Sequence, residues 1–117
     1  MTRILIVEDD PDLLFLYQTA LAQRHYEPVL TDTVAGAIAE LEQDQFDVVI
    51  LDLNIADAHG SAVIEYAQAN GLDHMKIFVV TANDHWLNAI VQTGAHKVLV
   101  KPVAIRDIVA LVDNVKT

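Results

Sequence analysis

The sequence contains no cysteine, which excludes a disulfide framework, a thiolate nucleophile and a cysteine-based zinc site. Basic residues are also scarce, because seven lysines and arginines stand against 17 aspartates and glutamates and give a formal net charge of −10. This charge repels nucleic-acid phosphates and anionic membrane surfaces at long range. We therefore expect no direct binding to nucleic acid or to membranes, and the absence of cysteine suits a cytoplasmic location.

Long hydrophobic runs are missing as well. No stretch approaches the ~20 apolar residues that span a bilayer. The first apolar run, Ile4 to Val7, is too short for the hydrophobic part of a signal peptide. The chain has 117 residues, of which 53% are hydrophobic and 21% charged, so it fits one domain with a substantial core. We expect residues 1–117 to form this single domain.

Five short apolar runs rich in β-branched residues recur along the chain. They are apolar at consecutive positions, which predicts strands buried on both faces, as in a parallel sheet covered by helices. The expected strands are Ile4–Val7, Val29–Thr31, Val48–Leu51, Ile77–Thr81 and Val98–Val100.

Segments with helical periodicity alternate with these strands. In the first of them we expect a buried stripe that leaves Leu14 and Phe15 outside it. The stripe consists of Leu13, Leu16, Tyr17, Ala20 and Leu21. The further helices are expected around Ala35–Leu41, Ala62–Ala69, Trp86–Gln92 and Ile105–Val115.

The alternation of strand and helix indicates an α/β fold. It favours a doubly wound three-layer (βα)5 domain of the flavodoxin-like type, with a parallel five-stranded sheet in the order 2-1-3-4-5. Periodicity alone does not fix that order. Ligands of such sheets bind outside the carboxyl ends of the strands, where the winding reverses between strands 1 and 3. Functional residues are therefore expected at the strand ends.

Polar residues stand at four of the predicted strand ends. They are Glu8-Asp9-Asp10, Asp52, Thr81 and Lys101-Pro102. Carboxylates that converge on one edge repel one another, so the site should either raise a pKa or hold a cation. An all-oxygen site of this kind matches Mg²⁺, and zinc is disfavoured because neither thiolate nor histidine stands at these strand ends.

The same residues offer a chemistry. With a metal ion and Lys101 beside it, the Asp52 carboxylate can act as a nucleophile toward phosphorus, and the hydroxyl of Thr81 can donate to a phosphoryl oxygen. Each residue alone also has a structural interpretation. In particular, Asp10-Pro11 is typical of a helix N-cap and first turn.

Four segments, VEDD, VVILDLNIADAHG, FVVTA and GAHKVLVKP, resemble the signature segments of response-regulator receiver domains, and the resemblance covers essentially the whole chain. It implies that Asp52 is the phospho-acceptor of a two-component phosphorelay, with Thr81 as the switch hydroxyl, the small Ala82 after it and Lys101 as the phosphate-pairing lysine. It implies a cis peptide bond between Lys101 and Pro102. It also implies an Mg²⁺ site formed by Asp9, Asp52, Glu8 acting through water, and the backbone carbonyl of Asn54.

The resemblance implies partners too. The donor would be the phosphohistidine of a histidine kinase or a phosphotransfer protein, the output partner is unknown, and a homodimer is possible. Leu14, Phe15 and the loops at the strand ends are expected to dock the kinase. The domain would act as a cytoplasmic signalling phospho-acceptor rather than an enzyme, although it assists its own phosphorylation and dephosphorylation.

The sequence departs from the family pattern at several positions. Ala56 replaces the usual proline, His59 replaces a common aspartate, and Val98 replaces the tyrosine or phenylalanine of the switch. The stretch from Thr81 to Lys101 is about two residues shorter than usual. The five histidines, at positions 25, 59, 74, 85 and 96, lie mostly in polar contexts, where a solvated side chain is the ordinary case.

Three other functions fit parts of the pattern. The altered switch residues leave open a receiver-like interaction module that works without phosphorylation. Asp52-Leu53-Asn54 loosely resembles the DxD start of a haloacid-dehalogenase-type phosphatase, although that motif belongs on the first strand. An FMN carrier shares the expected architecture, but the acidic loop after the first strand would repel the flavin phosphate.

Overall fold

The computed structural model describes residues 2–53, 55, 59–82 and 97–115. The described residues contain nine elements: β1 (Ile4–Val7), α1 (Pro11–Ala22), β2 (Val29–Thr31), α2 (Val34–Gln43), β3 (Val48–Asp52), α3 (Ser61–Ala69), β4 (Lys76–Thr81), β5 (Lys97–Val100) and α5 (Ile105–Asp113). All five predicted strands are confirmed, and their ends agree with the prediction to within one residue. The helix expected around Trp86–Gln92 lies outside the described residues.

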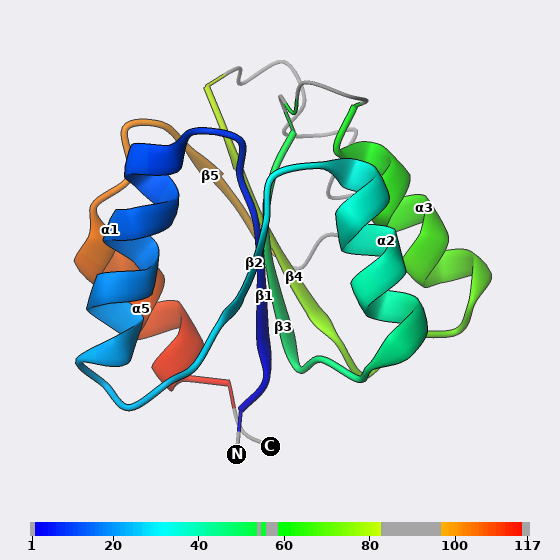
Figure 1. The fold of residues 1–117 in the computed structure, drawn as a ribbon, viewed down its shortest axis with the longest axis horizontal. Helices are drawn as coiled ribbons and strands as arrows, with labels where there is room; N and C mark the ends of the chain where they lie inside the picture. The colour runs from blue at the N-terminus through cyan, green and yellow to red at the C-terminus, as the bar shows by residue number, and fades with distance from the viewer. Residues whose placement is uncertain (1, 54, 56–58, 83–96, 116–117) are drawn as a thin grey trace.

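The five strands form one parallel sheet in the order β2-β1-β3-β4-β5. This is the predicted order of a doubly wound sheet, in which the winding reverses between β1 and β3. Figure 1 shows the consequence, with α1 and α5 on one side of the sheet and α2 and α3 on the other. No helix in the described part of the chain is long and apolar enough to cross a membrane.

The two faces of the sheet have separate cores. Successive side chains of a strand point to opposite faces, so Leu5 and Val7 pack with the α2–α3 layer, whereas Ile4 and Ile6 pack with α1 and α5. All four residues of β1 are therefore buried. This explains why β1 and β3 read as continuous apolar runs rather than as alternating ones. The edge strands β2 and β5 are only partly buried, so the expected burial on both faces is wrong for them.

Helix α1 begins with a proline and a side-chain cap, as the sequence predicted. The Asp10 side chain accepts hydrogen bonds from the backbone N–H groups of Asp12, at 2.9 Å, and Leu13, at 3.4 Å. Pro11 occupies the first turn, where its missing N–H costs nothing. After the helix, His25 has a φ of 67°, a left-handed conformation that normally favours glycine.

The predicted buried stripe of α1 is partly wrong. Tyr17 and Leu21 are buried as expected, but the side chain of Leu16 is 48% exposed. Leu14, which we placed outside the stripe, instead packs against the core beside α5. The exposed large hydrophobic residues of this helix are therefore Phe15, at 65%, and Leu16.

Candidate functional site

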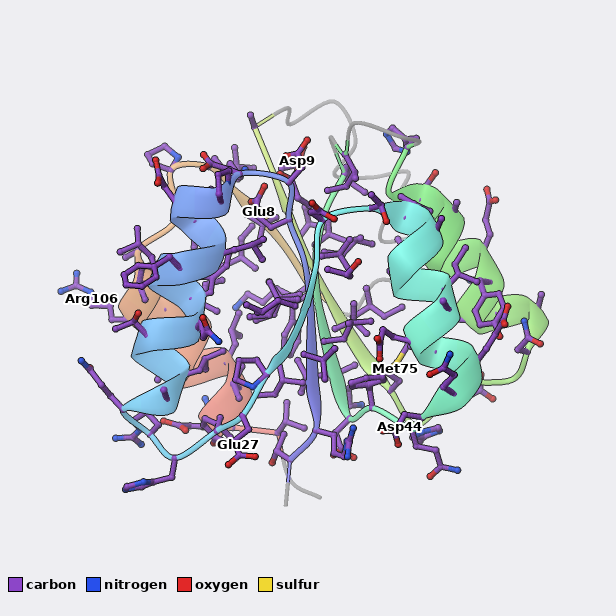
Figure 2. The ribbon with its side chains drawn as sticks, in the orientation of Figure 1. Glu8, Asp9, Glu27, Asp44, Met75 and Arg106 are labelled. Atoms are coloured by element: carbon purple, nitrogen blue, oxygen red, sulfur yellow. The ribbon has the colours of Figure 1, made fainter. Side chains whose placement is uncertain are left out.

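The polar residues at the strand ends meet at one edge of the sheet, as predicted. Glu8 and Asp9 follow β1, Asp52 is the last residue of β3, Thr81 is the last residue of β4, and Lys101 follows β5. Figure 2 shows Glu8 and Asp9 at the upper end of β1. Because β3 pairs with both β1 and β4, the Asp52 carboxylate lies at the middle of this edge.

Lys101 links the two buried carboxylates of the site. Its Nζ donates to Asp52 Oδ2 at 2.9 Å and to Glu8 Oε1 at 3.3 Å. Glu8 is only 2% exposed and Asp52 only 4%. One ammonium group therefore faces two desolvated carboxyl groups, and it cannot neutralise both of them when they are ionised.

Glu8 bears the electrostatic cost of this arrangement. Burial raises the pKa of Glu8 to about 7, with a further contribution from its hydrogen bond to Asp52, while the Asp10 N–H and Lys101 act in the opposite direction. The backbone N–H of Asp10 donates to Glu8 Oε2 at 3.2 Å. For clustered carboxylates we predicted either a raised pKa or a bound cation, and the raised pKa of Glu8 is the first of these outcomes. A bound cation would lower the pKa of Glu8 again.

The ammonium group of Lys101 is held in its charged form. Burial on its own would lower the pKa of Lys101, but the hydrogen bond and the charge of Asp52, followed by those of Glu8, outweigh burial and raise it. Lys101 therefore supplies a permanent positive charge beside Asp52 across the neutral pH range.

Asp9 completes an acidic group that could hold a metal ion. One carboxylate oxygen each from Glu8, Asp9 and Asp52 lies within 4.8 Å of the other two, and Asp9 is exposed whereas its two neighbours are buried. Three hard oxygen donors with an open, solvent-facing side fit a cation such as Mg²⁺. Asp10 is different, because its side chain caps α1.

The ends of β4 and β5 are joined through the backbone. The N–H of Lys101 donates to the carbonyl of Thr81 at 2.7 Å. Thr81 is fully buried, and Ala82 after it is exposed. The peptide bond between Lys101 and Pro102 is cis, as the resemblance implied. The backbone hydrogen bond to Thr81 fixes Lys101 relative to the strand that ends in Thr81.

Asn54, Ala56, His85, Trp86 and His96 lie outside the described residues.

The remaining departures from the family pattern lie away from the carboxylates. Val98 is half-buried and packs against the core on the α2–α3 side of the sheet. The exposed His59 accepts a hydrogen bond at Nδ1 from the N–H of Ser61 at 3.2 Å, and its ring contacts the Ser61 hydroxyl at 2.8 Å. His25 and His74 are exposed, and no histidine belongs to a candidate metal group in the described part of the chain.

Sequence reasoning gave no role to Gly60. Its N–H donates to the carbonyl of Leu53 at 2.9 Å, and a Cβ at this position would lie 2.5 Å from the backbone oxygen of Asp52. Glycine therefore allows the loop after β3 to return against the strand that carries Asp52. The sequence shows a glycine in this loop, which hints at a close backbone approach, but it does not show which backbone segment the glycine approaches.

Tyr17 was predicted only as a core residue, yet it also lies near the site. It is 3% exposed, and burial, followed by the charge of Glu8, raises its pKa. It lines an open pocket of about 400 Å³ together with Leu13, Lys101, Pro102 and Val103. A largely apolar hollow therefore borders the carboxylate site on the α1 side.

The chain resembles known proteins over almost its full length. The family model of the response regulator receiver domain matches residues 4–113. The sensory transduction protein RegX3 of Mycolicibacterium smegmatis is 30% identical over 112 residues, which are 94% of this chain and 48% of that protein. The response regulator SaeR of Staphylococcus aureus is 26% identical over 118 residues, 100% of this chain and 51% of that protein. The chain thus spans about half the length of these curated relatives.

Solved structures show the same fold. The response regulator TrrA from Thermotoga maritima, in complex with Mg²⁺-BeF, has a TM-score of 0.87 and 25% identity, with coverage of 99% of this chain and 100% of that one. A CheY-like receiver domain protein from Methanospirillum hungatei has a TM-score of 0.88 and 28% identity, with coverage of 97% and 91%.

Proposed function

The chain belongs to the family of response regulator receiver domains, and on this premise we propose that Asp52 accepts a phosphoryl group from a phosphohistidine. The observation that carries the proposal is the contact of Lys101 with Asp52, beside two further carboxylates. A nucleophilic carboxylate, a fixed cation and a set of metal-ligating oxygens are the groups that phosphoryl transfer to aspartate requires.

In the proposed step, one oxygen of Asp52 attacks the phosphorus atom of the phosphohistidine. The new O–P bond forms while the N–P bond of the donor breaks, and its electron pair stays on the ring nitrogen, which takes up a proton. The product is an aspartyl phosphate and a free histidine.

We assign the cation to Mg²⁺, which Asp9 and Asp52 would hold directly, Glu8 would hold through water and, as the resemblance implies, Asn54 would hold through its backbone carbonyl. The donor set supports this assignment, because three carboxylate oxygens lie within 4.8 Å of one another. The Mg²⁺-BeF complex of TrrA supports it as well. When bound, the cation supplies positive charge that stabilises the transferring phosphoryl group.

Lys101 and Thr81 complete the proposed site. Lys101 Nζ, already 2.9 Å from Asp52 Oδ2, would turn toward a phosphoryl oxygen once the acceptor is modified. The Thr81 hydroxyl would donate to a second phosphoryl oxygen. The backbone bond between these two residues holds both groups at the same edge of the sheet.

The proposed donor is a histidine kinase or a phosphotransfer protein, and we place its docking surface on α1 beside the site. Phe15 and Leu16 are exposed on this helix, and the open pocket lined by Leu13, Tyr17 and Lys101 adjoins them. Exposed apolar side chains next to a reactive group are typical of a docking surface. Membership in the family is also the ground on which we propose an output partner and a homodimer. A cytoplasmic location and a single domain over residues 1–117 are proposed on the same ground.

Intact mass spectrometry tests the acceptor directly. Incubation of the protein with acetyl phosphate and Mg²⁺ should add one phosphoryl group, and chelation of the metal should prevent the addition. The matched variant Asp52→Asn keeps the size of the side chain and should remain unlabelled. Equal labelling of Asp52→Asn would refute the assignment of Asp52.

A further inference from the structure

We propose that the end of the domain opposite to Asp52 docks an arginine-bearing, basic segment of a partner protein. The site is a groove between the end of α2 and the connection from α3 to β4. It lies outside the phosphoryl-transfer site and goes beyond the function proposed above. Figure 2 shows Asp44 and Met75 at this lower end, with Glu8 and Asp9 at the upper end.

The groove has an apolar floor and a polar rim. It is an open hollow of about 400 Å³, and its floor consists of Leu41, Phe46, Leu72 and Met75. Leu41, Phe46 and Met75 are buried core residues, and Leu72 is half-buried. The rim carries two acids together with other polar side chains: Glu42, Gln43, Asp44, Gln45 and His74. A long side chain with an apolar stem and a charged head fits such a hollow.

The negative charge of the α2–α3 layer favours a cationic ligand in the groove. No lysine or arginine occurs in the sequence between Arg24 and Lys76, a stretch that includes all of α2 and α3. Glu42 on the rim is exposed and forms no ion pair within the described part of the chain. Asp73 is likewise exposed and lines an adjoining hollow that shares Leu72 and Met75 with the groove. A basic segment would therefore find carboxylates that are already accessible.

A guanidinium group from the chain itself is already bound at this end. Arg3 forms an ion pair with Asp44, and its guanidinium carbon lies 5.4 Å from the centre of the Phe46 ring. An ion pair with a carboxylate and a position over an aromatic ring are both contacts for which a guanidinium group is well suited. Asp44 and Phe46 also line the groove, so the same surface continues from Arg3 toward Glu42.

The location separates this site from the phospho-acceptor. The groove lies beside the amino ends of β3 and β4, whereas Asp52 is the last residue of β3. A segment bound at the groove therefore leaves Asp52 and α1 accessible. Binding at the groove and phosphorylation of Asp52 are therefore expected to occur on the same molecule.

The experiment uses the full chain and a short synthetic peptide with arginine at both ends and leucine between them. Amide spectra recorded during titration should show the largest shifts in residues 41–46 and 72–75. The double variant Glu42→Gln with Asp73→Asn should weaken binding about three- to tenfold, because two exposed charge pairs are lost.

The matched control is Glu65→Gln with Asp107→Asn, which removes one exposed glutamate and one exposed aspartate outside the groove. It should bind the peptide as the original protein does, and both variants should keep the dispersed spectrum of the folded domain. Equal weakening in the two variants would overturn the proposal, since it would indicate attraction to net charge alone. Shifts centred on Asp9 or Asp52, or no shifts in residues 41–46, would overturn it as well.

Discussion

Replacement of Glu8 by glutamine should stabilise the metal-free domain at pH 8 and flatten the pH dependence of its stability. The pKa of Glu8 is raised from 4.5 to about 7 in the folded state. The folded protein therefore binds the Glu8 proton more tightly than the unfolded chain, so this carboxyl contributes most to stability below pH 4.5. That contribution is lost as the pH rises toward 7.

The magnitude follows from the pKa difference. One pKa unit corresponds to about 1.4 kcal/mol, so the rise of the Glu8 pKa amounts to about 3 kcal/mol, of which roughly 2–3 kcal/mol falls between pH 5 and pH 8. The other shifted groups titrate outside this window. The pKa values of three of them rise above 10 and that of the fourth falls below 3.8, and these groups are Tyr17, Tyr26, Lys101 and Asp113.

Urea denaturation in the presence of a chelator, at pH 5, 6, 7 and 8, measures this effect. The free energy of unfolding of the original protein should fall by roughly 2–3 kcal/mol more across this range than that of Glu8→Gln. Added Mg²⁺ should restore the original protein at pH 8 more than it restores the variant. An identical pH slope in both proteins would refute the electrostatic account of Glu8.

Four further outcomes are expected. Asp9→Ala should abolish Mg²⁺ binding in a calorimetric titration, whereas Glu8→Gln should weaken it less, because a direct ligand contributes more than one acting through water; unchanged affinity of Asp9→Ala would contradict the metal site. His25→Gly should raise the free energy of unfolding by about 1 kcal/mol, since glycine adopts the left-handed φ of 67° without strain, and a loss of stability would contradict this. Phe15→Ala should slow phosphotransfer from the cognate kinase but not labelling by acetyl phosphate, and an unchanged transfer rate would exclude the docking surface. Beryllofluoride should shift the amide signals around Val98 only modestly and those of residues 82–86 more, because the small, stiff side chain of valine cannot move between an exposed and a buried position as an aromatic can. The reverse pattern would show that the usual coupling survives without the aromatic.

The strands were predictable because their signal is local. Each is a short β-branched run between polar segments, and burial on both faces of the sheet explains the unbroken apolar runs of the central strands β1, β3 and β4. The buried face of α1 was not predictable in the same way. Residues 13–17 are five consecutive apolar residues, so helical periodicity allows more than one stripe. The packing of α1 against α5 and the sheet selects Leu14 and Tyr17 and leaves Leu16 exposed.

The convergence of the candidate site residues was predictable, but their geometry was not. The topology rule brings Glu8, Asp9, Asp52 and Lys101 to one edge of the sheet. It does not say that Glu8 is buried while the next residue, Asp9, is exposed, nor that one lysine contacts both buried carboxylates. The cap formed by Asp10 was predictable, because the aspartate, the proline and the helix adjoin in sequence. Contacts such as the approach of Gly60 to Asp52 join segments that only the folded chain brings together.

Chemical trapping of the phosphorylated residue tests the central claim most directly. Borohydride reduces an aspartyl phosphate to homoserine, so treatment of the phosphorylated protein, followed by proteolysis and mass spectrometry, identifies the modified residue. We predict that homoserine appears at position 52 alone, only when both Mg²⁺ and a phosphodonor were present. Homoserine at Asp9, Asp10 or another carboxylate, with Asp52 unmodified, would contradict the assignment of the phospho-acceptor.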